Sequence, residues 1–404
     1  MGIHDCSVLV IGGGPAGLRA AEVARAANAS VTLCDAQPSV GRKFLVAGRG
    51  GLNLTHGEPV ENFPQRYDSE PERWRDLLRE LGPNDLRAWA DELSVETYVG
   101  TSGRVFPRGQ KAAILLRAWL RRLRLAGVQF RTGARLTSLQ FHDRFWRAEL
   151  VREGEPFAIS AEAVVLALGG ASWPETGSEG TWPALFAAHD IEITPWSPAN
   201  CGWEIEWPAA FLEKQEGQPL KNLTVSAGGE SVSGELLITR YGIEGGAIYR
   251  LGPKLRAMQS PEIAIDLKPQ LSAAALRARL TRTENPAQWL RAVKLSPSAV
   301  ALLKSIFPED LHEIERLIAR IKRISLPLRG PRPIAEAISS AGGVAWTELT
   351  AALMIGKMPG VFVAGEMIDW EAPTGGYLLQ GCFSTGTRAG RSAADFAASV
   401  GLTR

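Results

Sequence analysis

The first forty residues follow the order strand, glycine-rich turn, helix, strand. Cys6–Ile11 is a short apolar run with β-branched residues, the pattern of a strand buried on both faces. Gly12–Gly17 follows directly, and the alanine-rich stretch Leu18–Ala27 has the composition of a helix. A second strand-like run, Ser30–Cys34, ends at Asp35. The pattern predicts a βαβ unit whose first connection is the glycine-rich turn.

Two later apolar runs, Ala163–Leu168 and Val361–Ala364, also look like buried strands, and a glycine follows each. Between them, from about residue 191, short strand-like pieces are separated by glycine and proline turns, and helical patterns follow. We therefore predict an α/β fold with a Rossmann-type domain in residues 1–190 and 334–404. The insert at 191–333 is expected to be mainly β and barrel-like in 191–270 and mainly helical in 271–333.

The glycine-rich turn has the spacing G-x-G-x-x-G between a strand and a helix, which is the dinucleotide-binding fingerprint. Gly12 permits the tight turn, Gly14 lets the backbone approach a pyrophosphate, and Gly17 allows close packing of helix on strand. Asp35 lies 18 residues after Gly17 and is expected to accept hydrogen bonds from the adenosine ribose. A purely structural βαβ turn is the alternative. The predicted cofactor-binding residues here are Gly12, Gly14, Pro15, Ala16, Gly17, Asp35 and Ala36.

Two further segments favour FAD over NAD, because they bring the chain back to the cofactor. Val40–Thr55 is rich in glycine and cationic residues with few features of a regular element, so Arg42 and Lys43 are expected to neutralise phosphate charge. A surface loop without cofactor contact is the alternative. Glu366 is expected to hold a ribityl hydroxyl, and a helix beginning near Gly381 to aim its N-terminus at the flavin ring. The other predicted FAD-binding residues are Gly48, Asn53, Leu136, Ala167, Gly169, Gly365, Gly375, Gly376 and Tyr377.

Several segments also match the motifs of a known family. Gly41–His56 reads GRKFLVAGRGGLNLTH, and Gly103–Pro107 reads GRVFP. Gly360–Asp369 reads GVFVAGEMID, and Pro373–Gln380 reads PTGGYLLQ. These blocks resemble those of the HI0933-like flavoproteins, a bacterial family also called aminoacetone-oxidase-like, which implies the glutathione-reductase-like flavoprotein fold with FAD and the same insert. Residues 134–136, which include Leu136, fall where related flavoproteins contact adenine through the backbone. The family's usual cysteine in the first block is Leu52 here, so no role of that cysteine carries over to this chain.

These features predict an FAD-dependent oxidoreductase that binds FAD non-covalently and acts on a small-molecule substrate. No second G-x-G-x-x-G and no CxxC dithiol are present, which excludes disulfide-reductase chemistry. Reduction by NAD(P)H that visits the flavin directly and reduction by the substrate itself both stay open. Tyr377 is the candidate proton donor or ring-stacking residue, and Arg104 is the candidate anion anchor. A structural or regulatory flavin, and a flavin monooxygenase, are the alternatives.

Composition narrows the partners and the location. With 45 basic and 43 acidic residues the net charge is +2, so no nucleic-acid partner is indicated. The apolar runs are too short for a membrane span, and because a strand begins almost at the N-terminus we expect no signal peptide. The four cysteines, Cys6, Cys34, Cys201 and Cys382, are far apart, so we expect no metal cluster and a reducing, cytoplasmic location. The pattern indicates no particular oligomeric state.

Overall fold

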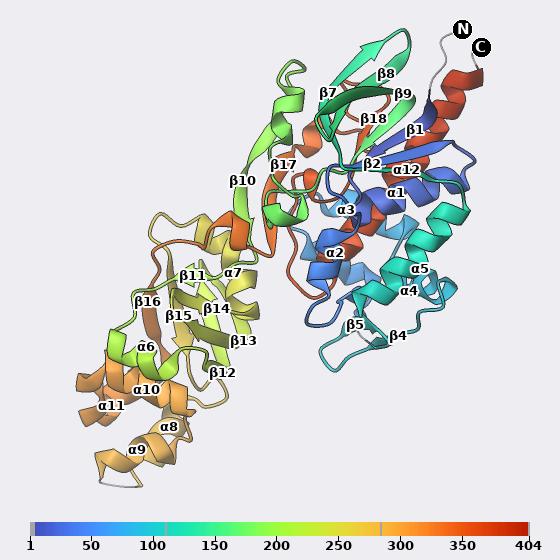
Figure 1. Cartoon of the computed structure of the whole chain (residues 1–404). Helices are drawn as coiled ribbons and strands as arrows, with labels where there is room; N and C mark the ends of the chain where they lie inside the picture. The colour runs from blue at the N-terminus through green and yellow to red at the C-terminus, as the bar shows by residue number, and fades with distance from the viewer. Residues whose placement is uncertain (1–4, 110, 283–284, 403–404) are drawn as a thin grey trace. The chain divides into compact units, whose positions relative to one another are not determined.

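The computed structural model describes residues 5–109, 111–282 and 285–402 (Figure 1). The chain forms two compact units, Met1–Ser197 with Ser339–Arg404, and Pro198–Ile338. The sequence pattern places these boundaries at 190/191 and 333/334. The chain leaves the first unit and returns to it through β10 (Ile193–Ala199) and β17 (Ser339–Val344), which pair with each other. The pairing keeps the exit and the return of the chain together.

The first unit is built on a mixed sheet. Its strands are β1 (Cys6–Ile11), β2 (Val31–Asp35), β6 (Gln129–Thr132), β7 (Ala134–His142), β8 (Phe145–Arg152), β9 (Glu155–Leu166) and β18 (Val361–Val363). The order is β6-β2-β1-β9-β8-β7, with β18 parallel to the last residues of β9. β6, β2, β1 and β9 are parallel neighbours, whereas β7 and β8 are antiparallel. Chain order reverses between β1 and β9, where parallel sheets of this kind bind ligands. The α/β Rossmann-type fold class is confirmed.

In the first unit, a pair of helices joins the beginning of the chain to its end. The α-helices of the unit are α1 (Pro15–Ala26), α2 (Arg42–Ala47), α3 (Pro71–Glu80), α4 (Pro83–Glu92), α5 (Ala112–Leu125) and α12 (Tyr377–Leu402). α1 and α12 pack against each other, and both contact β1 and β9 (Figure 1). A Cβ on Gly386 or Gly390 of α12 would lie 2.4 Å from the carbonyl oxygen of Ala16 or Ala20. The two helix backbones are therefore in direct contact.

Two elements differ from the sequence-based expectation. Residues 42–47, expected to lie in an irregular loop, form helix α2, because Phe44 is buried and packs edge-on against Trp119. Helix α12 begins at Tyr377 rather than near Gly381. A Cβ at Gly381 would lie 2.8 Å from the ring of Trp370, so this glycine serves helix packing and does not mark a helix start. A small antiparallel sheet is formed by β3 (Thr55–His56), β4 (Thr97–Val99) and β5 (Arg104–Pro107), with β5 as its central strand.

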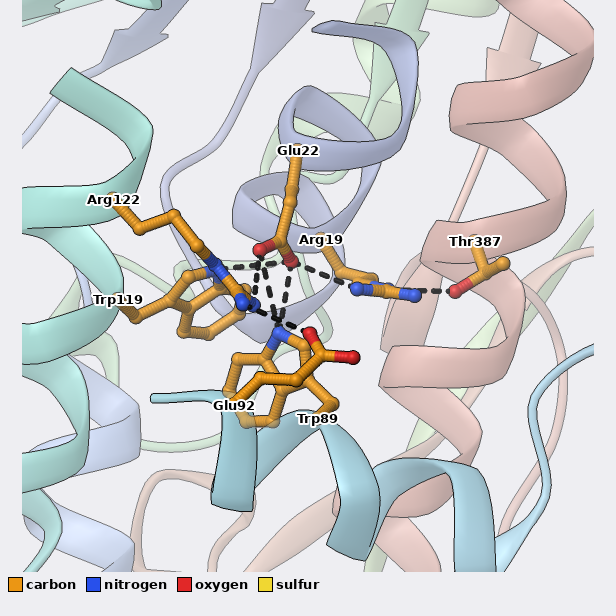
Figure 2. Close-up of polar contacts among 7 residues, drawn as sticks. All are labelled: Arg19, Glu22, Trp89, Glu92, Trp119, Arg122 and Thr387. Atoms are coloured by element: carbon orange, nitrogen blue, oxygen red, sulfur yellow. Dashed lines mark hydrogen bonds and ion pairs between the residues drawn. The ribbon is translucent and has the colours of Figure 1, made fainter. Parts of the chain in front are cut away.

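Glu22 on α1 is the centre of a polar cluster that ties α1 to α4 and α5 (Figure 2). Its carboxylate accepts hydrogen bonds from the indole nitrogens of Trp89 at 3.0 Å and Trp119 at 3.1 Å. Arg122 at 2.5 Å and Arg19 at 2.8 Å supply the opposite charge, and Arg19 also donates to a threonine of α12. The Glu22 side chain is only 13% exposed, so its charge is stable there only because these donors surround it.

The second unit has a sheet, helices and a hydrophobic core of its own. The strands are β11 (Trp203–Glu204), β12 (Pro219–Ala227), β13 (Glu230–Thr239), β14 (Gly242–Glu244), β15 (Glu262–Asp266) and β16 (Ile324–Pro327), in the order β11-β14-β13-β12-β15-β16. After β16, Gly330 accepts a hydrogen bond from the Glu204 amide and the Arg329 amide donates to Glu204, at 2.8 and 2.9 Å. The chain thus returns from the last strand to the first, as in a barrel. The helices are α6 (Ala209–Gln215), α7 (Gly246–Arg256), α8 (Ala273–Leu280), α9 (Pro286–Ala292), α10 (Pro297–Ile306) and α11 (Ile314–Lys322).

Across both units, none of the described helices has the length and apolar character that a membrane crossing requires.

We predict that Glu22→Ala lowers the free energy of unfolding of the first unit by about 2–4 kcal/mol, because it leaves a guanidinium and two indole N–H groups without their acceptor. Glu92→Ala is the matched control, since Glu92 also pairs with Arg122 but its side chain is 69% exposed. The control should cost less than about 1 kcal/mol. Denaturant unfolding followed by tryptophan fluorescence compares the two, and equal losses would contradict a stabilising role specific to Glu22.

Candidate cofactor-binding site

A cavity of about 340 Å³ lies at the carboxyl ends of the parallel strands of the first unit. Its walls come from the turn between β1 and α1, the end of β2, the start of α2, the start of β7, the loop after β9 and the residues after β18. Segments from the beginning, the middle and the end of the chain therefore meet in one cavity. Its place, where chain order reverses between β1 and β9, is the place expected for a dinucleotide.

The glycine turn forms one wall of this cavity, and its glycines have different tasks. Gly12 has φ +105°, and a Cβ there would lie 2.2 Å from the carbonyl oxygen of Ala167. Gly17 does not line the cavity, and its absent Cβ would lie 1.8 Å from the carbonyl oxygen of Gly12. Gly14 does line it, and a Cβ there would meet no atom within 4 Å. Gly14 caps α1 and Pro15 is its first residue, so the free amides of the helix start border the cavity.

Asp35 borders the cavity at the end of β2. Its two carboxylate oxygens accept hydrogen bonds from the backbone amides of Gly13 at 2.6 Å and Gln37 at 2.7 Å. Burial raises the pKa of Asp35, although these two hydrogen bonds and the charge of Arg42 act in the opposite direction. The backbone bonds fix the orientation of the carboxylate and leave lone pairs for ribose hydroxyls.

Lys43 and Glu366 connect two walls of the cavity that are far apart in the sequence. The Lys43 ammonium pairs with the Glu366 carboxylate at 2.7 Å and donates to the Ser172 hydroxyl at 2.8 Å. Both charged side chains are largely buried, with 23% and 11% of their surface exposed. Lys43 was expected to neutralise phosphate, whereas here its charge is directed to Glu366, the residue predicted to hold the ribityl chain.

Within the described ranges, Arg42 keeps a buried donor without a partner at this cavity. Its Nε is buried and has no hydrogen-bond partner among the residues that the structure describes. One of its outer nitrogens donates to the carbonyl oxygen of Glu175 at 3.4 Å. A buried guanidinium N–H without an acceptor fits an anionic group such as a pyrophosphate. Together with the glycine turn and Asp35, this makes the cavity fit FAD.

The predicted FAD-binding residues fall into two groups. Those that line the cavity are Gly12, Gly14, Pro15, Ala16, Asp35, Ala36, Arg42, Lys43, Leu136, Ala167, Gly169, Gly365 and Glu366. Those that do not are Gly17, Gly48, Asn53, Gly375, Gly376 and Tyr377, and Arg104 is also outside it. Cofactor contact stays a prediction for both groups, and so do the roles of Tyr377 and Arg104.

Tyr377, the first residue of α12, belongs to a second cluster on the same unit. Its hydroxyl donates to Glu58 at 2.6 Å, and Arg66 pairs with the same carboxylate at 2.5 Å. His56 stacks on the Tyr377 ring, with centroids 5.2 Å apart. Burial would raise the pKa of Glu58, but the hydrogen bonds from Arg66 and Tyr377 outweigh it, so the pKa is lowered. Burial raises the pKa of Tyr377 well above its usual value, and the hydrogen bond to the Glu58 carboxylate raises it further. The hydroxyl therefore keeps its proton and directs it at Glu58.

Arg104, the first residue of β5, lies beside the glycine pair that precedes α12. Its Nε is 3.4 Å from the position of a Cβ on Gly375, where φ is +117°. A Cβ on Gly376 would lie 2.3 Å from the carbonyl oxygen of Thr55, so the glycine pair is pressed against β3. Within residues 5–109, 111–282 and 285–402, the half-buried Arg104 guanidinium makes no hydrogen bond or ion pair. This leaves its five donors available to a ligand.

Part of the cavity wall was not predicted from the sequence. In the loop after β9, residues 176–182, Ala184 and Leu185 line the cavity, and Cys382 also borders it. The run TGSEG at residues 176–180 was the available signal, because Gly177 and Gly180 adopt positive φ where the chain bends over the cavity. The role of Glu58 was not predicted either, since Tyr377, which donates to it, is 319 residues further along the chain.

The family profile described as "HI0933-like protein Rossmann domain" matches residues 6–392. The chain belongs to the HI0933-like family. A 3-dehydro-bile acid delta(4,6)-reductase from Clostridium scindens is 27% identical over 413 residues, covering 96% of this chain and 98% of that protein. The ribosomal RNA dihydrouridine synthase of Escherichia coli is 22% identical, covering 93% of this chain and 95% of that protein.

Solved structures show the same fold for this HI0933-like chain. A 3-ketosteroid-delta4-(5alpha)-dehydrogenase from Rhodococcus jostii superposes with a TM-score of 0.54 at 15% identity, covering 96% of each chain. A flavocytochrome c3 fumarate reductase superposes with a TM-score of 0.51 at 16% identity, covering 97% of this chain and 78% of the other. The family and the fold together support a flavin-dependent oxidoreductase.

We predict that Gly14→Val lowers FAD affinity by about two orders of magnitude, because a branched side chain there takes the space of the pyrophosphate. The fold should persist, since a Cβ at this position meets no protein atom within 4 Å. Gly330→Val in the second unit is the matched control, because its Cβ is equally free of neighbours. FAD titrations and circular dichroism measure the two properties, and normal FAD binding by Gly14→Val would contradict the assigned position.

Proposed function

We propose that this protein is an FAD-dependent reductase of carbon–carbon double bonds conjugated to a carbonyl group. The observation that carries the flavin part is the cavity that collects the glycine turn, Asp35 and Glu366 from three separate strand ends. Asp35 and Arg42 are placed to hold the adenosine and pyrophosphate parts, and Glu366 the ribityl chain. When bound, FAD supplies a two-electron carrier that accepts or delivers hydride at its ring nitrogen N5.

The names of the two relatives both refer to a carbon–carbon double bond conjugated to a carbonyl group. A 3-dehydro bile acid with delta(4,6) double bonds carries alkenes conjugated to a ketone. Dihydrouridine is uridine whose ring double bond, next to a ring carbonyl, has been reduced. Steroid and nucleobase differ in size and polarity, but in both, hydride addition to the conjugated double bond would develop negative charge on the carbonyl oxygen. We infer the same bond type for the substrate of this chain.

Arg104 is the residue that we assign to this oxygen. Its guanidinium is half-buried and beside Gly375, where the missing Cβ leaves room for a ligand. A cationic donor aimed at an oxygen that gains negative charge lowers the barrier of such an addition. Tyr377 directs its proton to Glu58, so we assign it to hydrogen bonding and ring packing at the start of α12. The family's cysteine is replaced by buried Leu52, so a thiol at that position has no part in the proposal.

The electron donor distinguishes the remaining alternatives. NAD(P)H that visits the flavin directly would make the protein a nicotinamide-fed reductase. A flavin that only a substrate reduces would favour a dehydrogenase or oxidase. A flavin that neither reduces would favour a structural or regulatory cofactor, and coupled oxygen insertion would favour a monooxygenase.

We predict an oxidised-flavin spectrum for the purified protein, bleached anaerobically by NADH or NADPH. After anaerobic photoreduction, 2-cyclohexen-1-one, androst-4-ene-3,17-dione or uridine should restore the oxidised spectrum, whereas cyclohexene, which has no carbonyl, should not. A protein that neither contains nor takes up FAD would contradict the flavin assignment. A reduced flavin that oxygen reoxidises but none of these conjugated acceptors does would contradict the substrate class alone.

We predict that Arg104→Gln slows reoxidation by the active acceptor about 100-fold, because the developing oxyanion loses its cationic donor. FAD affinity and the flavin spectrum should stay unchanged. Arg108→Gln is the matched control on the same hairpin, since the ion pair of Arg108 with Glu96 leaves 70% and 73% of the two side chains exposed. Stopped-flow measurement compares the variants, and equal rates for both would remove Arg104 from the site.

A further inference from the structure

Arg135 and Glu179 form a two-point ion pair at one side of the cofactor cavity. The two outer nitrogens of Arg135 each donate to one carboxylate oxygen of Glu179, and both distances are 2.9 Å. Arg135 is the second residue of β7, and Glu179 lies in the loop after β9. Both residues line the cavity. Such paired bonds fix direction as well as distance, so they hold the two segments in one relative position.

The loop from Trp173 to Thr181 is tied to its own base, because the Ser178 hydroxyl donates to the carbonyl oxygen of Gly170 at 3.2 Å and the Trp196 indole donates to that of Gly180 at 2.9 Å. Trp173, Gly177 and Gly180 have φ of +56°, +102° and +67°, and the loop contains one short 3₁₀ turn at residues 174–176. Its exit is anchored, because the indole of Trp182 donates to the carbonyl oxygen of Gly169 at 2.8 Å. The loop borders the cavity from Thr176 to Thr181. The ion pair through Glu179 adds a charged link from this loop to β7, which forms another wall of the cavity.

The opposite end of this loop reaches the wall formed by β2 and α2. Arg42 donates to the carbonyl oxygen of Glu175 at 3.4 Å, and a Cβ at Gly177 would lie 2.8 Å from the side chain of Gln37. The loop thus spans the cavity from the Asp35 side to the β7 side. Asp35 and Leu136, which border these two sides, are the residues expected at the ribose and the adenine.

We propose that Arg135 and Glu179 are cofactor-retaining residues, whose ion pair clamps the 173–181 loop over the adenosine half of FAD and slows its release. The inference rests on FAD binding as proposed above, and it adds residues that neither the fingerprint nor the family motifs contain. The hydrogen bonds from Arg135 lower the pKa of Glu179, so the clamp keeps its charge at neutral pH. With 51% and 32% of the two side chains exposed, the clamp is also open to screening by salt.

The test measures FAD release from the holoprotein, with an excess of an apoflavoprotein to trap free FAD. Glu179→Gln and Arg135→Gln should each release FAD about three to five times faster, the range expected for an exposed ion pair. Added salt should accelerate release from the wild type and have little effect on the variants. The exchanged pair Arg135→Glu with Glu179→Arg should bring the rate back toward that of the wild type.

Two controls separate the clamp from a general loss of stability. Arg147→Gln breaks a similarly exposed pair on β8, where Arg147 and Glu149 are 2.7 Å apart, and should leave release unchanged. ADP, which carries only the adenosine half, should bind more weakly to the Glu179 and Arg135 variants, whereas FMN, which lacks that half, should bind all variants alike.

The outcomes are distinguishable. A wild type that takes up no FAD would overturn the proposed function and the clamp together. A wild type that holds FAD, with variants that release it at the rate of Arg147→Gln, would overturn the clamp alone. Faster release with unchanged ADP affinity would also overturn it, because the loop would then not act on the adenosine half.

Discussion

The cofactor site depends on the close packing of α1 against α12. The first and last helices of the chain meet with their backbones in contact, at Gly386 beside Ala16 and at Gly390 beside Ala20. This contact brings the turn before α1 next to Gly365 and Glu366, although the unit of residues 198–338 lies between them in the sequence. A side chain at either glycine would separate the helices and thereby the two halves of the cavity wall.

This arrangement has a cost that other interactions offset. Each glycine inside a helix costs about 1 kcal/mol relative to alanine, and Glu22 keeps a charge at low exposure. The α12 glycines are compensated by packing of the two helices, and the Glu22 charge by two arginines and two indole donors. Apolar packing and one charged cluster therefore fix α1 from different sides, which holds its N-terminus still at the cavity.

The sequence predicted the parts of the site that depend on local order. Gly12, Gly14 and Asp35 are separated by a fixed βαβ spacing, so chain order alone brings them to the cavity. Glu366 follows a buried strand, whose position in a parallel sheet fixes where it ends. Helix α2, the Glu58 cluster and the Arg135–Glu179 pair were not predicted, because each is formed by side chains from segments whose approach depends on the whole fold.

The arginines around the site differ in whether the protein already satisfies them. Arg66 and Arg135 each have a carboxylate partner, Glu58 eight residues away and Glu179 in the loop after β9, so their charge is used to position loops. Arg42 keeps a buried N–H without an acceptor, and the Arg104 guanidinium makes no hydrogen bond or ion pair within the part of the chain that the structure describes. Since buried donors are nearly always satisfied in folded proteins, the buried Nε of Arg42 indicates where a ligand oxygen belongs, whereas the half-buried Arg104 guanidinium is free to pair with a ligand that reaches it. Arg42 borders the dinucleotide cavity and Arg104 lies outside it, so cofactor and substrate are expected to supply one acceptor each.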